Sequence, residues 1–117
     1  MAVLAGNGES GFADGNGPDA RFRYPRGVAV REDGAIIVAD SENHCIRLVT
    51  LDGNVTTIAG NGMPGSADGN GLDARFEQPI SVTAFEGGTI VVAHPNSNSI
   101  RLITDYNYEG VMTKAAR

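Results

Sequence analysis

Residues 59–76 read Ala59-Gly-Asn-Gly-Met-Pro-Gly-Ser-Ala-Asp-Gly-Asn-Gly-Leu-Asp-Ala-Arg-Phe76. Residues 5–22 read Ala5-Gly-Asn-Gly-Glu-Ser-Gly-Phe-Ala-Asp-Gly-Asn-Gly-Pro-Asp-Ala-Arg-Phe22, so the same glycine-rich loop is written twice at a spacing of 54 residues. Self-similarity at a fixed period of this size is typical of repeat architectures. The chain therefore contains about two copies of one unit, each introduced by the loop.

The residues that follow each loop are organised as short apolar runs separated by turn signals. In the first unit the turn signals are Glu32-Asp33-Gly34, Asp40-Ser41-Glu42-Asn43 and Leu51-Asp52-Gly53-Asn54. The runs between them are rich in Val and Ile, which favour strands, and the second unit repeats this order. The sequence predicts an all-β fold with four antiparallel strands in each unit, near residues 26–31, 35–40, 45–51 and 54–59, then 80–85, 89–94, 99–104 and 110–114.

Length and composition limit the classes of protein. At 117 residues the chain is one domain or a piece of one, and a single cysteine rules out an internal disulfide, so no oxidising compartment is implied. The net charge of −5 argues against a nucleic-acid partner, because phosphate contacts need a clustered basic surface. No apolar run approaches the roughly 20 residues of a membrane span, and Met1–Ala5 is too short for a secretory signal. If the chain is complete, we expect it to be cytoplasmic.

Three segments of the first unit closely resemble the NHL repeat. They are Gly27-Val28-Ala29-Val30, Ile37-Val38-Ala39-Asp40-Ser41-Glu42-Asn43-His44-Cys45-Ile46-Arg47 and Val55-Thr56-Thr57-Ile58-Ala59-Gly60. The loop, with its Ala-Asp-Gly and Ala-Arg-Phe, resembles the family as well. The second unit matches less closely, because residues 94–99 read His-Pro-Asn-Ser-Asn-Ser where the family usually has Asp, Asn-His and a basic residue.

The resemblance implies a β-propeller built of four-stranded antiparallel blades, one blade per repeat. Residues 1–117 then form two NHL-type repeats, with blade one at about 26–59, blade two at about 80–114, and glycine-rich connecting loops at 5–25 and 59–79. The family includes binding modules, RNA-binding domains and a few enzymes, so the fold alone does not assign an activity.

Two blades cannot close a ring, since propellers typically have about four to eight. An isolated pair would expose apolar strands on both flanks, and repeat units bury such faces by stacking on neighbours. The chain is therefore either a fragment of a longer propeller or a subunit of a homo-oligomer. Three copies would give six blades, the number that the family resemblance favours. Residues 1–4 match the end of an outer strand, and we expect this strand to pair with the second blade of a neighbouring copy.

His44 and His94 are the only histidines, and each lies near the turn between the second and third strands of its unit. A zinc or iron site needs several converging His or Cys ligands, which a symmetric ring could supply from several copies. The sequence favours the alternative, in which both are polar turn residues. Cys45 begins a strand with no base nearby in the sequence, so a buried apolar role is favoured over a reactive thiol.

Asp14 and Asp19, with their copies Asp68 and Asp73, place oxygen ligands at loop spacing. The loops depart from the calcium-binding pattern, which requires a third acidic residue, a glycine next and a closing Glu. The favoured alternative is a set of hydrogen-bonded turns in which Asp and Asn side chains cap backbone groups. These four aspartates and the two histidines are the weak candidates for a metal site, and no cofactor is indicated.

Several residues recur at the repeat period and are interpreted as structural. Phe22 and Phe76 end the two loops, and we expect both to be buried beside the blades as loop anchors. Arg47 and Arg101 recur at one strand position, and Asp40 is placed to pair with Arg47 across two strands. Ligand binding by the arginines is the alternative.

The sequence contains no Ser-His-Asp order, phosphate-binding loop or paired catalytic carboxylates. The interpretation that it favours is a non-catalytic NHL-repeat propeller segment, a scaffold that binds another protein through one loop-built face of the ring. Two alternatives stay open. One is a metal-dependent lyase-type enzyme, which needs a central metal, and the other is an RNA-binding NHL domain, which needs a basic face.

Overall fold

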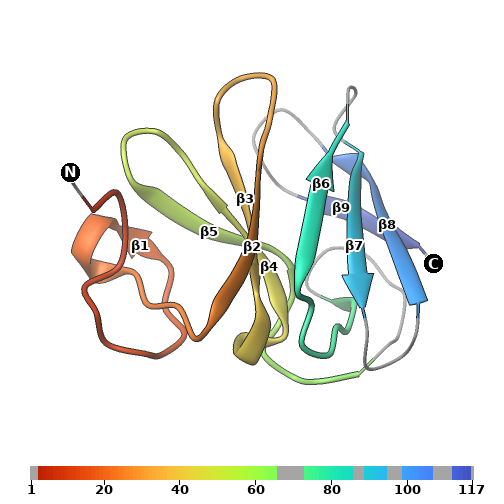
Figure 1. Cartoon of the computed structure of the whole chain (residues 1–117), viewed down its shortest axis with the longest axis horizontal. Helices are drawn as coiled ribbons and strands as arrows, with labels where there is room; N and C mark the ends of the chain where they lie inside the picture. Colours follow the sequence, from red (N-terminus) through yellow and green to blue (C-terminus); the bar gives the residue numbers. More distant parts are fainter. Residues whose placement is uncertain (1–2, 66–72, 86–88, 95–98, 107–111, 117) are drawn as a thin grey trace.

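The computed structural model describes residues 3–65, 73–85, 89–94, 99–106 and 112–116. It consists of two antiparallel sheets that pack against each other (Figure 1). The first sheet has the strand order β1-β5-β4-β3-β2, and the second has the order β6-β7-β8-β9. We call the four-stranded meander β2–β5 blade 1 and the meander β6–β9 blade 2. The described residues include no helix with the length and hydropathy needed to cross a bilayer.

All eight strands that the sequence predicts are present, with bounds that differ by at most two residues. Two single 3₁₀ turns, η1 at Gly17–Asp19 and η2 at Ser41–Asn43, lie in the first unit. The strands are β1 at Gly15–Asn16, β2 at Pro25–Val30, β3 at Ile36–Asp40, β4 at Cys45–Val49, β5 at Asn54–Gly60, β6 at Ser81–Ala84, β7 at Ile90–His94, β8 at Ser99–Tyr106 and β9 at Met112–Ala116.

The predicted strand at residues 1–4 is not found at Val3 and Leu4, and Met1 and Ala2 lie outside the described residues. The extra strand is instead β1, which pairs antiparallel with the outer edge of β5. The loop folds back on its own blade because its glycines supply backbone bonds there. The Gly17 N–H donates to the Gly53 carbonyl at 2.8 Å, and the Gly6 N–H donates to the Gly17 carbonyl at 3.0 Å.

The main core lies between the two blades. Successive residues of a strand point to opposite faces, and one face of each blade enters this core. Phe76, at the end of the second loop, is buried in it and fills the space beside both blades. From blade 1 the core takes Ala35, Ile37, Ala39, Ile46, Leu48, Ile58 and Ala59, and from blade 2 it takes Val82, Ile90, Val92 and Ile103.

A smaller cluster lies on the opposite face of blade 1, where the first loop covers Val38, Val49 and Val55. This cover explains why β3 is apolar on both faces. Phe22 packs against the cluster but is only half-buried, so the expectation that both phenylalanines are buried is wrong for Phe22. The physical reason is that Phe76 has a blade on each side, whereas Phe22 has blade 1 on one side only.

Gly27 sets the distance between the inner strands of the two blades. A Cβ at this position would lie 2.6 Å from the Ile80 carbonyl oxygen and 2.9 Å from the Ser81 Cα. Backbone atoms cannot yield as a flexible side chain can, so only glycine allows β2 and β6 to approach this closely.

Candidate functional site

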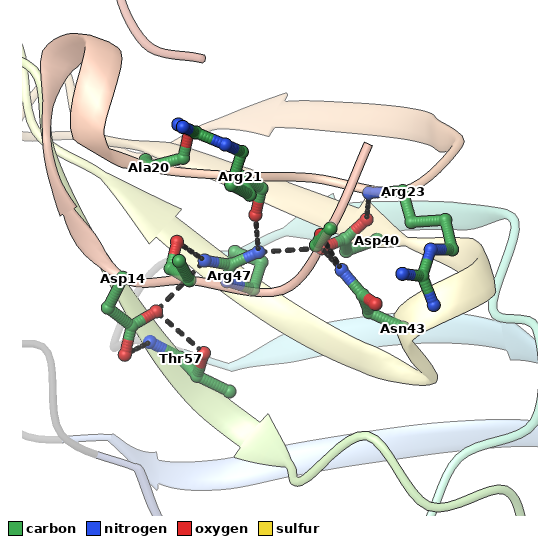
Figure 2. Close-up of polar contacts among 10 residues, drawn as sticks. Asp14, Ala20, Arg21, Arg23, Asp40, Asn43, Arg47 and Thr57 are labelled. Carbon is green, nitrogen blue, oxygen red and sulfur yellow. Dashed lines mark hydrogen bonds and ion pairs between the residues drawn. The ribbon is translucent and has the colours of Figure 1, made fainter. Parts of the chain in front are cut away.

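A buried arginine joins the first loop to blade 1. Arg47 lies on β4, and its side chain is fully buried. Its Nη1 donates to Asp40 Oδ2 at 2.6 Å and to the Arg21 carbonyl at 3.0 Å. Its Nη2 donates to Asp14 Oδ1 at 2.9 Å and to the Ala13 carbonyl at 2.8 Å. Figure 2 shows these four bonds radiating from one guanidinium group into the loop and into β3.

Asp40, at the end of β3, is the buried partner that the sequence placed opposite this arginine. The register sets Val38 directly opposite Arg47, so Asp40 is its diagonal neighbour on the same face. The Asp40 carboxylate also accepts a bond from the Arg23 backbone N–H and one from Asn43 Nδ2, each at 2.8 Å. The carboxylate therefore fixes the loop, the η2 turn and β4 to one another (Figure 2).

Two aromatic rings pack against the Arg47 guanidinium. Its central carbon lies 5.1 Å from the centre of the Phe12 ring and 4.9 Å from that of Phe22. Cation–π contacts of this kind are stronger when the charge is desolvated. Two carboxylates, two carbonyls and two rings thus compensate one buried charge, which is the arrangement a structural ion pair requires.

Blade 2 repeats part of this arrangement. Arg101 is buried on β8, donates to the Arg75 carbonyl at 2.9 Å, and lies 4.8 Å from the centre of the Phe76 ring. The repeat position of Asp40 is taken by His94, whose side chain lies outside what the structure describes. The arginine, the loop carbonyl and the phenylalanine are therefore the parts of the site common to both blades.

Residues 22–47, which carry Phe22, Asp40 and Arg47 at this spacing, match the family model of the NHL repeat. The first blade carries an NHL repeat. NHL repeat-containing protein 2 of Gallus gallus is 46% identical over 77 residues, which are 65% of this chain and 10% of that protein. Protein SUPPRESSOR OF QUENCHING 1, chloroplastic, of Arabidopsis thaliana is 36% identical over 94 residues, which are 80% of this chain and 9% of that protein. The chain spans about a tenth of the length of these curated relatives.

Solved structures resemble the NHL-repeat chain over most of its length. An auxiliary nutrient binding protein from Bacteroides thetaiotaomicron is 30% identical, with a TM-score of 0.72, over 85% of this chain and 27% of that one. A protein of unknown function from the same organism is 25% identical, with a TM-score of 0.77, over 99% of this chain and 27% of that one. The arrangement of two adjacent blades thus recurs as about a quarter of larger proteins.

One metal candidate, Asp14, is part of the hydrogen-bonded framework that joins the first loop to blade 1. Both Asp14 oxygens accept bonds from Thr57 on β5, from the hydroxyl at 2.9 Å and from the backbone N–H at 3.3 Å, in addition to the bond from Arg47. Asp19 and Asp73 are exposed, and Asp68 lies outside the described residues. Among the residues that the structure describes, no three His, Cys, Asp or Glu side chains gather closely enough to hold a metal ion.

His44 takes part in a contact between blade 1 and the segment just before blade 2, and the sequence did not indicate this contact. Its Nδ1 accepts a bond from the Gln78 backbone N–H at 3.1 Å, while Gln78 Nε2 donates to Glu42 at 2.7 Å. Gln78 and its repeat counterpart Tyr24 are both left-handed, at φ 48° and 54°. Each precedes a proline, Pro79 or Pro25, but a residue before proline is expected to be extended, so this pattern did not reveal the contact.

Cys45 begins β4 and is fully buried. Burial, together with the nearby Asp40 carboxylate, raises the pKa of its thiol far above the usual value. The thiol stays protonated at neutral pH and packs as a small apolar group, as the sequence favoured.

Proposed function

We propose that this chain is a non-catalytic segment of an NHL-repeat β-propeller and acts as a scaffold that binds another protein. The observation that carries the proposal is the composition of one end of the blades. There the turns after β2 and β4 lie on the same side as the end of β6 (Figure 1), and we call this side the hairpin end, residues 31–35, 50–53 and 85.

The hairpin end combines exposed apolar and acidic side chains. Leu51 and Phe85 are more than half exposed, although large apolar side chains are usually buried. Glu32, Asp33 and Asp52, in the turns after β2 and β4, are exposed as well. Apolar groups rimmed by charged groups are typical of protein-binding surfaces.

The charges of the hairpin end define the partner that would fit. A hydrogen bond from Arg31 lowers the pKa of Asp33 from 3.8 to about 2, and one from Thr50 lowers the pKa of Asp52, so both carboxylates are ionised at neutral pH. A protein surface with an apolar centre and basic residues around it would be complementary. The same negative charge works against RNA binding, which depends on neutralising phosphates.

The experiment compares the wild-type chain with Leu51→Asp and with Phe85→Asp as immobilised baits. Met63→Asp is the matched control, because Met63 is also an exposed apolar residue but lies in the loop before blade 2. We expect a protein that is retained by the wild type and by Met63→Asp to be lost from the other two baits. Equal retention by all four baits would show that the hairpin end is not the binding surface.

Two further measurements separate the proposal from its alternatives. The lyase-type alternative requires stoichiometric bound metal in the purified protein, which elemental analysis would detect. The RNA-binding alternative requires retention of RNA in a filter-binding assay that weakens steeply from low to high salt. We expect neither result.

A further inference from the structure

We propose that the open face of blade 1 is a docking surface for the open face of blade 2 of a second copy of this chain. The front flank is the face of blade 1 turned away from blade 2, and the rear flank is the face of blade 2 turned away from blade 1. The inference rests on the blade arrangement of the proposed function but not on the hairpin end, so the two can fail separately.

The front-flank residues are of the same or similar types as their counterparts in the second unit, which blade 1 buries. The front flank carries Val28, which is exposed, Phe22 and Ile36, which are partly buried, and Val38 and Val49, which the first loop already covers. Their counterparts 54 residues later are Phe76, Val82, Ile90, Val92 and Ile103, all buried in the core between the blades. Val82 is 6% exposed, whereas Val28 is 66% exposed. The front flank is therefore a nearly unchanged copy of a surface whose partner is known.

The rear flank is likewise a copy of the face that blade 1 presents to blade 2. That face consists of Ala29, Ile37, Ala39, Ile46 and Leu48. The counterparts on the rear flank are Thr83, Val91, Ala93, Ile100 and Leu102. Ile46 is fully buried, whereas Ile100 is 62% exposed. Because each open flank repeats one half of the internal interface, a second copy brings the matching half to either flank.

The residues that precede the first loop already occupy one corner of this interface. Leu4 and Ala5 line an apolar cavity of about 250 Å³ on the front flank, together with Phe22 and Val28. They hold the repeat positions of Ile58 and Ala59, which lie in the core between the blades. Leu4 and Ala5 therefore already occupy the position of the end of an outer strand. Blade 2 of the second copy then contributes the face formed by its inner strands.

One difference makes the distance between blades greater at the contact between copies than at the contact within a chain. The rear flank has Ser81 where blade 1 has Gly27, and Gly27 is the point where a Cβ would meet the backbone of the adjacent blade. A serine there holds the next inner strand further away. We therefore expect copies to separate on dilution before the two blades of one chain separate.

The contact is heterologous, since the front flank of one copy meets the rear flank of the next. This geometry gives a complementation test by sedimentation velocity at micromolar concentration. Val28→Asp prevents binding through the front flank and Ile100→Asp prevents binding through the rear flank, because each would bury a carboxylate in an apolar contact. We expect each variant alone to be monomeric, with association weakened at least about 30-fold.

A mixture of the two variants is the decisive sample. Val28→Asp keeps an intact rear flank and Ile100→Asp keeps an intact front flank, so the mixture should form a dimer with one copy of each and nothing larger. Leu51→Asp is the control, because Leu51 is as exposed as Val28 but lies in a turn, and it should associate like the wild type. Circular dichroism of every variant checks that it is folded.

Three results would overturn the proposal. The first is a wild-type chain that stays monomeric at micromolar concentration. The second is association of Ile100→Asp like the wild type while Val28→Asp is monomeric, because this indicates front-to-front contact. The third is a mixture of folded variants that stays monomeric. A monomeric wild type that still loses its partner on Leu51→Asp substitution would leave the proposed protein-binding function intact.

Discussion

Arg47 carries a buried positive charge, and the chain surrounds it with two carboxylates, two carbonyl oxygens and two aromatic rings. Isolated buried charges are costly, so such a group persists only where its partners are fixed in place. The loop that supplies most of these partners is glycine-rich and would otherwise be poorly ordered. Arg47 therefore holds the glycine-rich first loop in place against blade 1.

Removal of Asp40 should reveal this dependence. We predict that Asp40→Ala lowers the free energy of unfolding by about 3–5 kcal/mol, because it leaves the Arg47 charge buried with its closest partner missing. Urea denaturation measures the loss. Asp33→Ala is the control, since Asp33 pairs with Arg31 at the surface and should cost about 1 kcal/mol or less. Equal losses in the two variants would contradict the role given to the buried pair.

Asp33 gives a prediction for the effect of pH. The Arg31 hydrogen bond and the Ala35 N–H lower its pKa from 3.8 to about 2 in the folded chain. A lowered pKa means that the contribution to stability is present above pH 3.8 and is lost as pH falls through about 2. Because the carboxylate is mostly exposed, we expect Asp33→Asn to cost no more than about 1 kcal/mol at neutral pH. The difference from the wild type in urea melts should shrink as the pH approaches 2, and a difference independent of pH would contradict the assignment.

The two loops end in the same residue type, yet the elements around them differ. Phe76 is enclosed by both blades, and Phe22 has a blade on one side only. We predict that Phe76→Ala costs about 3–5 kcal/mol and that Phe22→Ala costs less than about 2 kcal/mol, since a half-buried ring leaves a smaller cavity. Denaturant melts at a concentration where the chain is monomeric provide the comparison. A greater loss for Phe22→Ala would mean that the front flank is covered in solution.

Contact between the inner strands β2 and β6 depends on the missing side chain at position 27. We predict that Gly27→Ala lowers the free energy of unfolding by about 1–3 kcal/mol, because the added methyl group meets the backbone of Ile80 and Ser81. Ser81→Ala is the matched control at the same repeat position, and it should change stability by less than about 0.5 kcal/mol. Thermal unfolding followed by circular dichroism distinguishes the two. A neutral Gly27→Ala would show that the inner strands can move apart without loss.

At the scale of the whole molecule, both ends of the blade stack are apolar and open. A head-to-tail contact closes into a ring only if the rotation per copy divides the circle, and otherwise it continues as a filament. We predict a closed ring of three copies, and hence six blades, so light scattering should give three times the mass of the single chain. A continuous increase of mass with concentration would indicate an open filament instead.

The sequence by itself determined the period of 54 residues, the eight strands and the pairing of Asp40 with Arg47. Turn signals and the alternation of strand side chains are local properties, so they can be recognised without the fold. Asp14 was not recognised as the second partner of Arg47 because it is 33 positions away in the sequence. The bond exists only because the loop closes over the blade, and no local pattern encodes that closure.

Only the tertiary structure decided which of two equivalent residues is buried. Val28 and Val82 are the same residue at the same repeat position, but one is exposed and the other is in the core. In the same way Gln78 contacts Glu42 and His44 of blade 1, while its counterpart Tyr24 is exposed at the front flank. Burial is a property of the neighbouring blade and not of the residue itself, and a repeated sequence gives both copies the same pattern whether or not a neighbour is present.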